Sequence, residues 1–230
     1  MFSINEKFVV IDTETTNSYN DAKGKPDMTD VMCYDIGFIV TDKNGHIYES
    51  YSFIVEEIFN DDAWMRSAYF ARKLPIYHND IAQGKRVVMP FMNIWRIFKE
   101  VCTRFHVRIV AAHNARFDCR ALNNTLRYLT GSKYRYFLPF NITWWDTMKM
   151  ASQVLGDDDM YWLHCQYMGC MTRHTKPRPS YSAENIYRYI SGNFSFTESH
   201  TGLEDVLIEK DILCYCLYHE PDINGKLWND

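Results

Sequence analysis

The order of the expected strands and helices predicts an α/β fold. Its mixed sheet begins with an antiparallel three-strand meander and continues with parallel strands, with helices on both faces. Three strands come first, and Asn44-Gly45 between the second and third is a strong hairpin signal. From about residue 91, helical patterns alternate with short buried strands. At 230 residues, the chain is predicted to be a single domain, 1–230.

The expected strands are short runs rich in valine, isoleucine and aromatic residues. They cover residues 7–12, 33–40, 47–55, 108–112 and 141–145. Each of the last two runs precedes a helical pattern, as in β-α-β units. Trp144 and Trp145 are expected in the core, one on each face of the sheet.

The expected helices cover residues 60–73, 91–104, 118–129, 185–190 and 201–218, with another directly after residue 145. In 91–104, apolar residues recur at three- and four-residue spacing, which is typical of an amphipathic helix. Gly131 ends the third helix, and the capping-box pattern from Thr201 to Glu204 starts the last. Glu204 and Glu209 are expected to be solvated or to cap that helix.

Composition and charge narrow the possible functions. The formal net charge is −4, so the chain lacks the broad basic surface of a tight non-specific nucleic-acid binder. No apolar run approaches the ~20 residues that span a bilayer. Because residues 1–7 also lack the features of a signal peptide, we expect a cytoplasmic protein without membrane contact. Seven cysteines without a framework spacing fit reduced thiols.

Three short acidic motifs are spread across nearly the whole chain. Asp12 and Glu14 end the first strand, Asp118 begins a helix, and His200 and Asp205 flank the start of the last helix. Side chains alternate along a strand, so Asp12 and Glu14 point to the same face. Four carboxylates can hold two hard divalent cations about 4 Å apart on a phosphodiester. The histidine can then take a proton from the attacking water.

Each motif alone also has a simpler explanation. Asp12 and Glu14 fit solvated acids at a strand end, and Asp118 fits a common first-turn helix acid. His200 in isolation is typical of a surface-loop histidine. The functional interpretation depends on all three motifs occurring together, in order.

Taken together, the motifs resemble a known family. D-x-E-T at Asp12, H-N-x-x-F-D at His113 and H-x-x-x-x-D at His200 resemble the DnaQ-like 3′→5′ exonucleases of the DEDD superfamily, histidine subtype. Residues 145–151 resemble a further family segment, and the family framework that these motifs mark runs from about residue 8 to about residue 217, with little specific similarity between the motifs. The resemblance implies an RNase H-like fold and cleavage from the 3′ end to 5′-mononucleotides.

The sequence departs from the family pattern in two places. Asn17 stands where the family usually has glycine, and the segment 17–30 is longer and more polar than usual. The segment 165–198 is also long. Both are predicted to be insertions within the domain, and they bear on the substrate rather than on the chemistry.

The resemblance also implies roles for individual residues. Asp12 would bridge two Mg²⁺ or Mn²⁺ ions, Glu14 and Asp205 would complete the first site, and Asp118 would hold the second ion. His200 would be the general base.

The implied substrate is the 3′ end of a single-stranded nucleic acid. Thr13, Thr15, Asn114 and Phe117 would contact its terminal nucleotide. A DNA polymerase or another replication protein is a candidate partner, and the sequence leaves the oligomeric state open.

Two further clusters have competing interpretations. Arg173, Lys176 and Arg178 lie in a proline-broken loop that is either solvated or contacts substrate phosphates. A second group with the loose spacing C-x₄-C fits either a zinc site or a helix with buried thiols. It consists of His164, Cys165, Cys170 and His174.

Three classes of function therefore stay open. The sequence favours an exonuclease on single-stranded DNA, with an exoribonuclease or oligonucleotide hydrolase as the alternative. A non-catalytic module that binds nucleic acid or a polymerase is the alternative of another class. Accidental motif matches in a structural or interaction protein are the remaining possibility.

Overall fold

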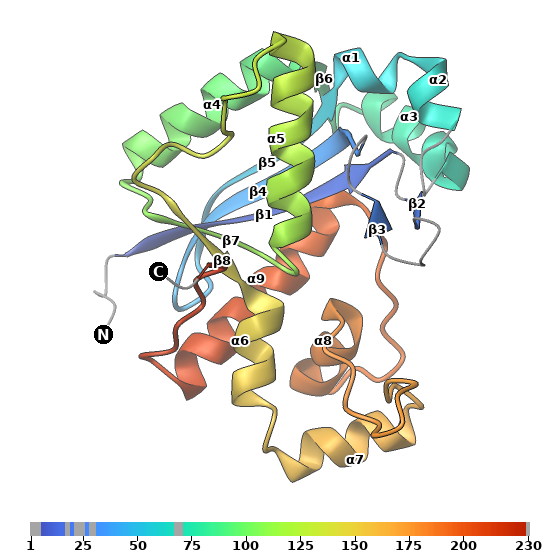
Figure 1. Ribbon diagram of the computed structural model, residues 1–230, viewed down its shortest axis with the longest axis vertical. Helices are drawn as coiled ribbons and strands as arrows, with labels where there is room; N and C mark the ends of the chain where they lie inside the picture. The colour runs from blue at the N-terminus through green and yellow to red at the C-terminus, as the bar shows by residue number, and fades with distance from the viewer. Residues whose placement is uncertain (1–5, 17–18, 21–25, 28–30, 67–70, 229–230) are drawn as a thin grey trace.

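A six-stranded mixed sheet forms the centre of the protein, and helices pack on both of its faces (Figure 1). The computed structural model describes residues 6–16, 19–20, 26–27, 31–66 and 71–228. The strand order is β6-β5-β4-β1-β7-β8; β4 is antiparallel to β1 and β5, and the other neighbours are parallel. The strands of this sheet are β1 (Lys7–Thr15), β4 (Cys33–Asp42), β5 (Ile47–Val55), β6 (Val87–Met89), β7 (Ile109–Ala112) and β8 (Thr143–Asp146). This is the predicted α/β, RNase H-like arrangement.

The helices divide between the two faces of the sheet. One face is covered by α1 (Glu56–Phe59), α2 (Asp62–Arg66), α3 (Leu74–Ala82), α4 (Phe91–Arg104) and α5 (Arg116–Thr130). The opposite face is covered by α6 (Thr147–Val154), α7 (Asp159–Tyr167), α8 (Ala183–Ser191) and α9 (Gly202–His219). A separate two-stranded sheet of β2 (Tyr19–Asn20) and β3 (Pro26–Asp27) lies in the segment 17–30, most of which is outside the described residues.

Side chains of β1 alternate between the two cores. Val9 and Ile11 pack in the core with α4 and α5, whereas Phe8 and Val10 pack in the core with α6 and α9. The same alternation buries Trp144 on the first side and Trp145 on the second, which confirms that prediction. Because the period is two, residue 12 and residue 14 must emerge on the α9 side, and residue 13 on the α5 side.

The observed elements differ most from the sequence-based boundaries between residues 56 and 89. Residues 67–70 of the predicted helix 60–73 lie outside the described residues, and the described parts form separate, shorter pieces. The Asp61 carboxylate accepts a hydrogen bond from the backbone of Ala63, so α2 begins at residue 62. Ala71–Lys73 is a 3₁₀ turn, and α3 begins directly after it with Pro75 in its first turn. Helix α3 and the short edge strand β6 had no strong periodic signal.

Helix α9 touches strand β4 backbone to backbone. A Cβ atom on Gly37 would lie 2.3 Å from the carbonyl carbon of Gly202, and one on Gly202 would lie 2.8 Å from the nitrogen of Gly37. Only glycine at both positions allows this approach. The backbone N–H of Gly202 donates to the buried carboxylate of Asp35, at 3.0 Å, so the start of α9 is fixed to the sheet.

Arg86 connects this contact to the rest of the sheet. Its side chain is buried and donates to Asp35 at 3.1 Å, to Asp80 at 3.2 Å and to Glu204 of α9 at 2.8 Å. The hydroxyl of Tyr77 on α3 also donates to Asp35, at 2.8 Å. One guanidinium therefore compensates three acids from β4, α3 and α9.

No helix within the described residues is long and apolar enough to cross a membrane. All seven cysteines are free thiols, as expected.

Replacing Arg86 with alanine is expected to lower the free energy of unfolding by about 3–5 kcal/mol, because it leaves the buried Asp35 carboxylate without its cation. Urea denaturation followed by circular dichroism measures the change. The control is Arg66→Ala, whose side chain is 83% exposed and should change stability by less than about 0.5 kcal/mol. Equal, small effects of the two substitutions would show that Arg86 does not hold α9 to the sheet.

Candidate functional site

The candidate site lies where β1 extends beyond its neighbour β7. Pairing of the two strands ends at Val10 and Ala111, and the chain then turns away at Asn114, whose φ of 61° is left-handed. The next strand residues therefore lack a partner on that side. The backbone N–H of Thr13 instead donates to the carboxylate of Asp118 at 3.1 Å, and its hydroxyl donates to the same oxygen at 2.8 Å.

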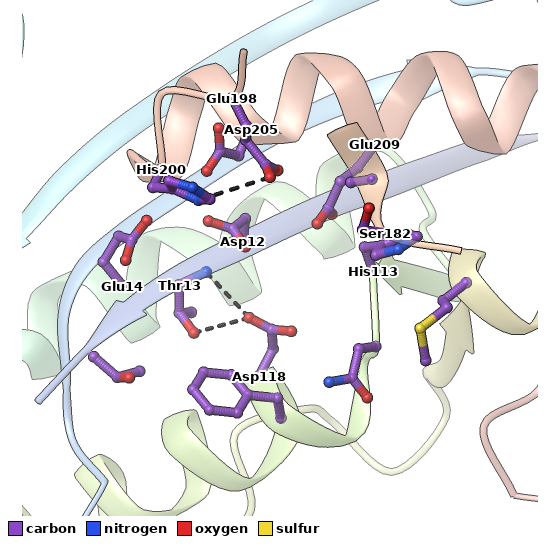
Figure 2. Close-up of a pocket in the computed structure, with 15 residues that line it drawn as sticks. Asp12, Thr13, Glu14, His113, Asp118, Ser182, Glu198, His200, Asp205 and Glu209 are labelled. Carbon is purple, nitrogen blue, oxygen red and sulfur yellow. Dashed lines mark hydrogen bonds and ion pairs between the residues drawn. The ribbon is translucent and has the colours of Figure 1, made fainter. Parts of the chain in front are cut away.

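A cavity of about 440 Å³ opens at this point (Figure 2). It brings together all five residues that the sequence proposed for the chemistry, from β1, α5, α9 and the segment before α9. The predicted substrate contacts Thr13, Thr15, Asn114 and Phe117 line it as well. The lining residues with acidic or imidazole side chains are Asp12, Glu14, His113, Asp118, Glu198, His200, Asp205 and Glu209.

The carboxylates are arranged as a set of oxygen ligands. Asp12 and Glu14 lie on the face of β1 that α9 covers, and Asp205 projects from the first turn of α9. Carboxylate oxygens of these three residues lie within 4.8 Å of one another. Asp118 faces the same cavity from the other side of Thr13. Oxygen-only sets of this kind suit hard divalent cations such as Mg²⁺ and Mn²⁺.

Burial and mutual repulsion raise the pKa values of these carboxylic acids. Burial raises the pKa of Asp118 to about 7 and, together with the charge of Glu198, that of Asp205 to about 8. The pKa of Asp12 is raised by burial and then by the charges of Glu209 and Asp118. Ionised carboxylates this close are unfavourable without a counter-charge, and a divalent cation would supply one. The donor set therefore fits the metal ions that the sequence implied.

His200 lines the cavity from the segment that leads into α9, and its side chain is 41% exposed. Its backbone is left-handed, with φ of 53°, and Lys73 donates to its carbonyl oxygen at 3.4 Å. Partial burial, and then the nearby charge of Lys73, lower the pKa of the imidazole, so the ring is neutral at pH 7. Its Nδ1 lies 3.7 Å from a carboxylate oxygen of Glu198. A neutral imidazole beside a carboxylate set can accept a proton.

Thr201 stands at the N-terminal cap of α9, as expected, but its hydroxyl makes a different contact. It donates to the carboxylate of Glu204 at 2.8 Å and does not cap the backbone. Glu204 is half exposed and also pairs with Arg86. The interpretation of Glu204 as a cap is thus partly right, because it supports the helix start through side chains.

Two acids of the site were missed from the sequence. Glu209 was expected to be solvated or to cap the helix, and this was wrong: it is 3% exposed and lines the cavity. It follows Asp205 by four residues, so the two share one face of α9. That spacing was the available signal. Glu198 precedes His200 in a segment without a pattern, and nothing in the sequence singled it out.

The imidazole ring of His113 holds neighbouring segments of the site together. One ring nitrogen lies 3.0 Å from the hydroxyl of Thr147, and the other lies 2.8 Å from the carbonyl oxygen of Tyr181. Burial lowers the pKa of the ring, so it is neutral. The histidine therefore ties the end of β7 to α6 and to the segment that carries Ser182, another lining residue.

The predicted basic loop lies outside the cavity lining. Arg173, Lys176 and Arg178 are exposed on a turn closed by a bridge between Met171 and Pro179. The same segment continues into Ser182 and Ala183, which do line the cavity.

The proposed zinc ligands are engaged elsewhere. His164 lies 3.2 Å from the side-chain oxygen of Asn185, whose amide nitrogen donates to the buried Cys165 sulfur. Within the described part of the chain, Cys170 and His174 join neither of these two in a group of metal-ligating atoms. The buried-thiol interpretation fits this helix.

Comparisons with solved structures identify the fold. The nuclease domain of 3′hExo, a DEDDh family member solved with rAMP, gives a TM-score of 0.62 at 14% identity over 96% of this chain and 98% of that one. Exonuclease I of E. coli, solved with ssDNA, gives 0.56 at 12% identity over 94% and 41%. Exonuclease I of Methylocaldum szegediense gives 0.54 at 15% identity over 94% and 41%.

No protein-family model matches the chain, and no curated sequence matches it. The chain thus has the fold of the DnaQ-like DEDDh exonucleases, and it spans less than half the length of the exonuclease I chains.

The close carboxylates in the cavity lead to a prediction about the stability of the metal-free protein. In excess EDTA at pH 8, Asp12→Asn is expected to raise the free energy of unfolding by about 0.5–2 kcal/mol, because it relieves repulsion at a functional site. Adding Mn²⁺ should raise the melting temperature of this variant less than it raises that of the wild type. Differential scanning fluorimetry measures both.

The exposed Asp62→Asn serves as the control, and it should change neither quantity. A variant that is destabilised in EDTA and still gains the full Mn²⁺ effect would identify Asp12 as a structural hydrogen-bond acceptor instead.

Proposed function

We propose that this protein is a metal-dependent 3′→5′ exonuclease that removes 5′-mononucleotides from single-stranded DNA. One observation carries the proposal: four carboxylates and a neutral histidine, from segments far apart in the sequence, line one cavity. The fold likeness to DEDDh exonucleases supports the same conclusion. An exoribonuclease or oligonucleotide hydrolase is the alternative, which is favoured by the rAMP bound to the 3′hExo domain.

Two Mg²⁺ or Mn²⁺ ions would be held by the carboxylates already described. Asp12, Glu14 and Asp205 would hold the first, and Asp12 and Asp118 the second. When bound, such ions activate a water nucleophile and stabilise charge on the leaving oxygen of a phosphodiester.

The protein's own contribution to the chemistry is a proton acceptor. In this proposal Nε2 of His200 takes the proton from the attacking water, because Nδ1 faces Glu198. The imidazolium that forms would be stabilised by the carboxylates of Glu198 and Asp205, whose ligand atoms lie within 4.8 Å of the ring nitrogen.

Other lining residues would position the 3′-terminal nucleotide. The ring of Phe117 offers an apolar surface for a base or sugar, and Asn114, Thr13 and Thr15 offer polar groups. A replication protein as partner and a cytoplasmic location stay predictions from the sequence.

The direct test is digestion of matched DNA and RNA strands, each labelled at the 5′ or the 3′ end. With Mg²⁺ or Mn²⁺, the 5′-labelled DNA should shorten step by step, while the 3′ label should leave at once as a mononucleotide. Excess EDTA should stop the reaction. Digestion of RNA alone would favour the alternative, binding without digestion would favour a non-catalytic module, and robust digestion in EDTA would remove the two-metal proposal.

His200→Ala is expected to lower turnover by about 10²–10⁴-fold, the usual contribution of a general base, while Mn²⁺ affinity stays near that of the wild type. Asp12→Ala should weaken Mn²⁺ binding as well. The control is His219→Ala at the exposed far end of α9, which should keep full activity. Equal loss of metal affinity in the His200 and Asp12 variants would make His200 a ligand or a structural residue.

We also propose that Arg173, Lys176 and Arg178 contact upstream phosphates of a long strand. Replacing all three with alanine should raise KM for long single strands. It should also reduce the slope with which KM depends on salt concentration, by the amount expected for the loss of up to about three phosphate contacts. Cleavage of a nitrophenyl ester of thymidine monophosphate should stay nearly unchanged, because that substrate has no upstream phosphate. Equal losses on both substrates would show that the loop supports the fold or the site.

A further inference from the structure

Six carboxylates line the cavity, and Glu209 is the one that the proposed reaction does not use. It projects from α9 into the cavity between Asp205 and the end of β7 (Figure 2). Only 3% of the residue is exposed, and among the described residues its Oε2 has no hydrogen-bond partner. The backbone N–H of His113 bonds to the carboxylate. One oxygen of a buried acid is thus aimed into the site without a partner.

A purely structural role does not explain an acid at this position. The charges that act most strongly on Glu209 are those of Asp118 and Asp205, both negative. Glu209 is in turn the largest charge acting on Asp12. A buried carboxylate without compensation is unfavourable by several kcal/mol, and an apolar side chain of similar volume would pack at lower free energy. The position therefore calls for a cation.

The neighbours of Glu209 indicate which cation. Asp12, Glu14 and Asp205 already form a close group of three ligands on the Glu14 side of the cavity. Glu209 lies away from Glu14, toward Asp12, Asp118 and the end of β7 (Figure 2). Among the described residues, Asp12, Asp118 and Glu209 do not form a group whose ligand atoms all lie within 4.8 Å of one another. We therefore propose that Glu209 helps to bind the ion that Asp12 and Asp118 hold, and that it does so through a bridging water molecule. This inference rests on the proposed function only for the identity of the two ions.

One consequence separates this arrangement from a site without Glu209. The second ion would then be surrounded by three carboxylates, as many as the first has, so both ions bind before any nucleic acid is present. The protein alone should bind two Mn²⁺ ions.

Isothermal titration calorimetry and Mn²⁺ electron paramagnetic resonance of the nucleic-acid-free protein test the proposal. Glu209→Gln keeps the shape and removes the charge, and it should weaken one of the two Mn²⁺ sites at least about 10-fold. Asp211→Asn is the matched control, since Asp211 lies on the same helix, is 42% exposed and pairs with Lys210. It should bind both ions as the wild type does.

A double-mutant cycle identifies the shared ion. If Glu209 and Asp118 hold the same ion, Glu209→Gln should reduce Mn²⁺ affinity much less in an Asp118→Asn background than in the wild type. Additive losses would overturn the proposal. Unchanged binding by both Glu209→Gln and Glu209→Asp would overturn it too; the second variant keeps the charge but withdraws the carboxylate by one methylene. Circular dichroism in EDTA checks that each variant is folded.

The result is independent of the nuclease assay. If the wild type digests strands and Glu209→Gln binds Mn²⁺ normally, the inference fails and the proposed function stands. If the wild type binds two Mn²⁺ ions, Glu209→Gln binds one and no strand is digested, the ligand assignment stands and the proposed function fails.

Discussion

The contact between Gly37 and Gly202 is the constraint on which the site depends. Because the backbones of β4 and α9 touch there, the first turns of α9 lie low over β1, and Asp205 comes within ligand distance of Asp12. Asp35 then fixes the helix by accepting the N–H of Gly202. A side chain at either glycine would lift the helix and separate the acids, whatever the sequence of the acidic motifs.

The rest of the fold can be understood as support for an unfavourable cluster of charges. The acids of the site repel one another, and burial disfavours their ionised forms. Two cores, one on each face of the sheet, hold the strand that carries Asp12. Next to the contact between β4 and α9, Arg86 forms ion pairs with three acids that do not line the cavity. Local instability at the site is thus offset by packing and ion pairs around it.

Local sequence patterns predicted much of this arrangement, but they could not predict contacts between segments that lie far apart in the sequence. Alternation along β1 was enough to place Asp12 and Glu14 on one face, and the capping pattern found the start of α9 within one residue. The burial of Glu209 depends on how α9 lies against β1, which no local pattern encodes. Likewise, Asp35, Arg86 and Glu204 meet from three distant segments, so no local pattern in the sequence links them. The predicted helix 60–73 was wrong because the Asp61 side chain starts α2 at residue 62 and a 3₁₀ turn at Ala71–Lys73 precedes a separate helix, α3.

The position of α9 in the chain has a consequence for biosynthesis. Helix α9, which carries Asp205, follows both β1 with Asp12 and α5 with Asp118 in the chain, so the ligand set is incomplete until the ribosome has made α9. Until α9 emerges, the face of β1 and β4 that it covers is an exposed apolar surface, which nascent chains usually shield with chaperones. The four-carboxylate set therefore cannot assemble on a chain that ends before α9.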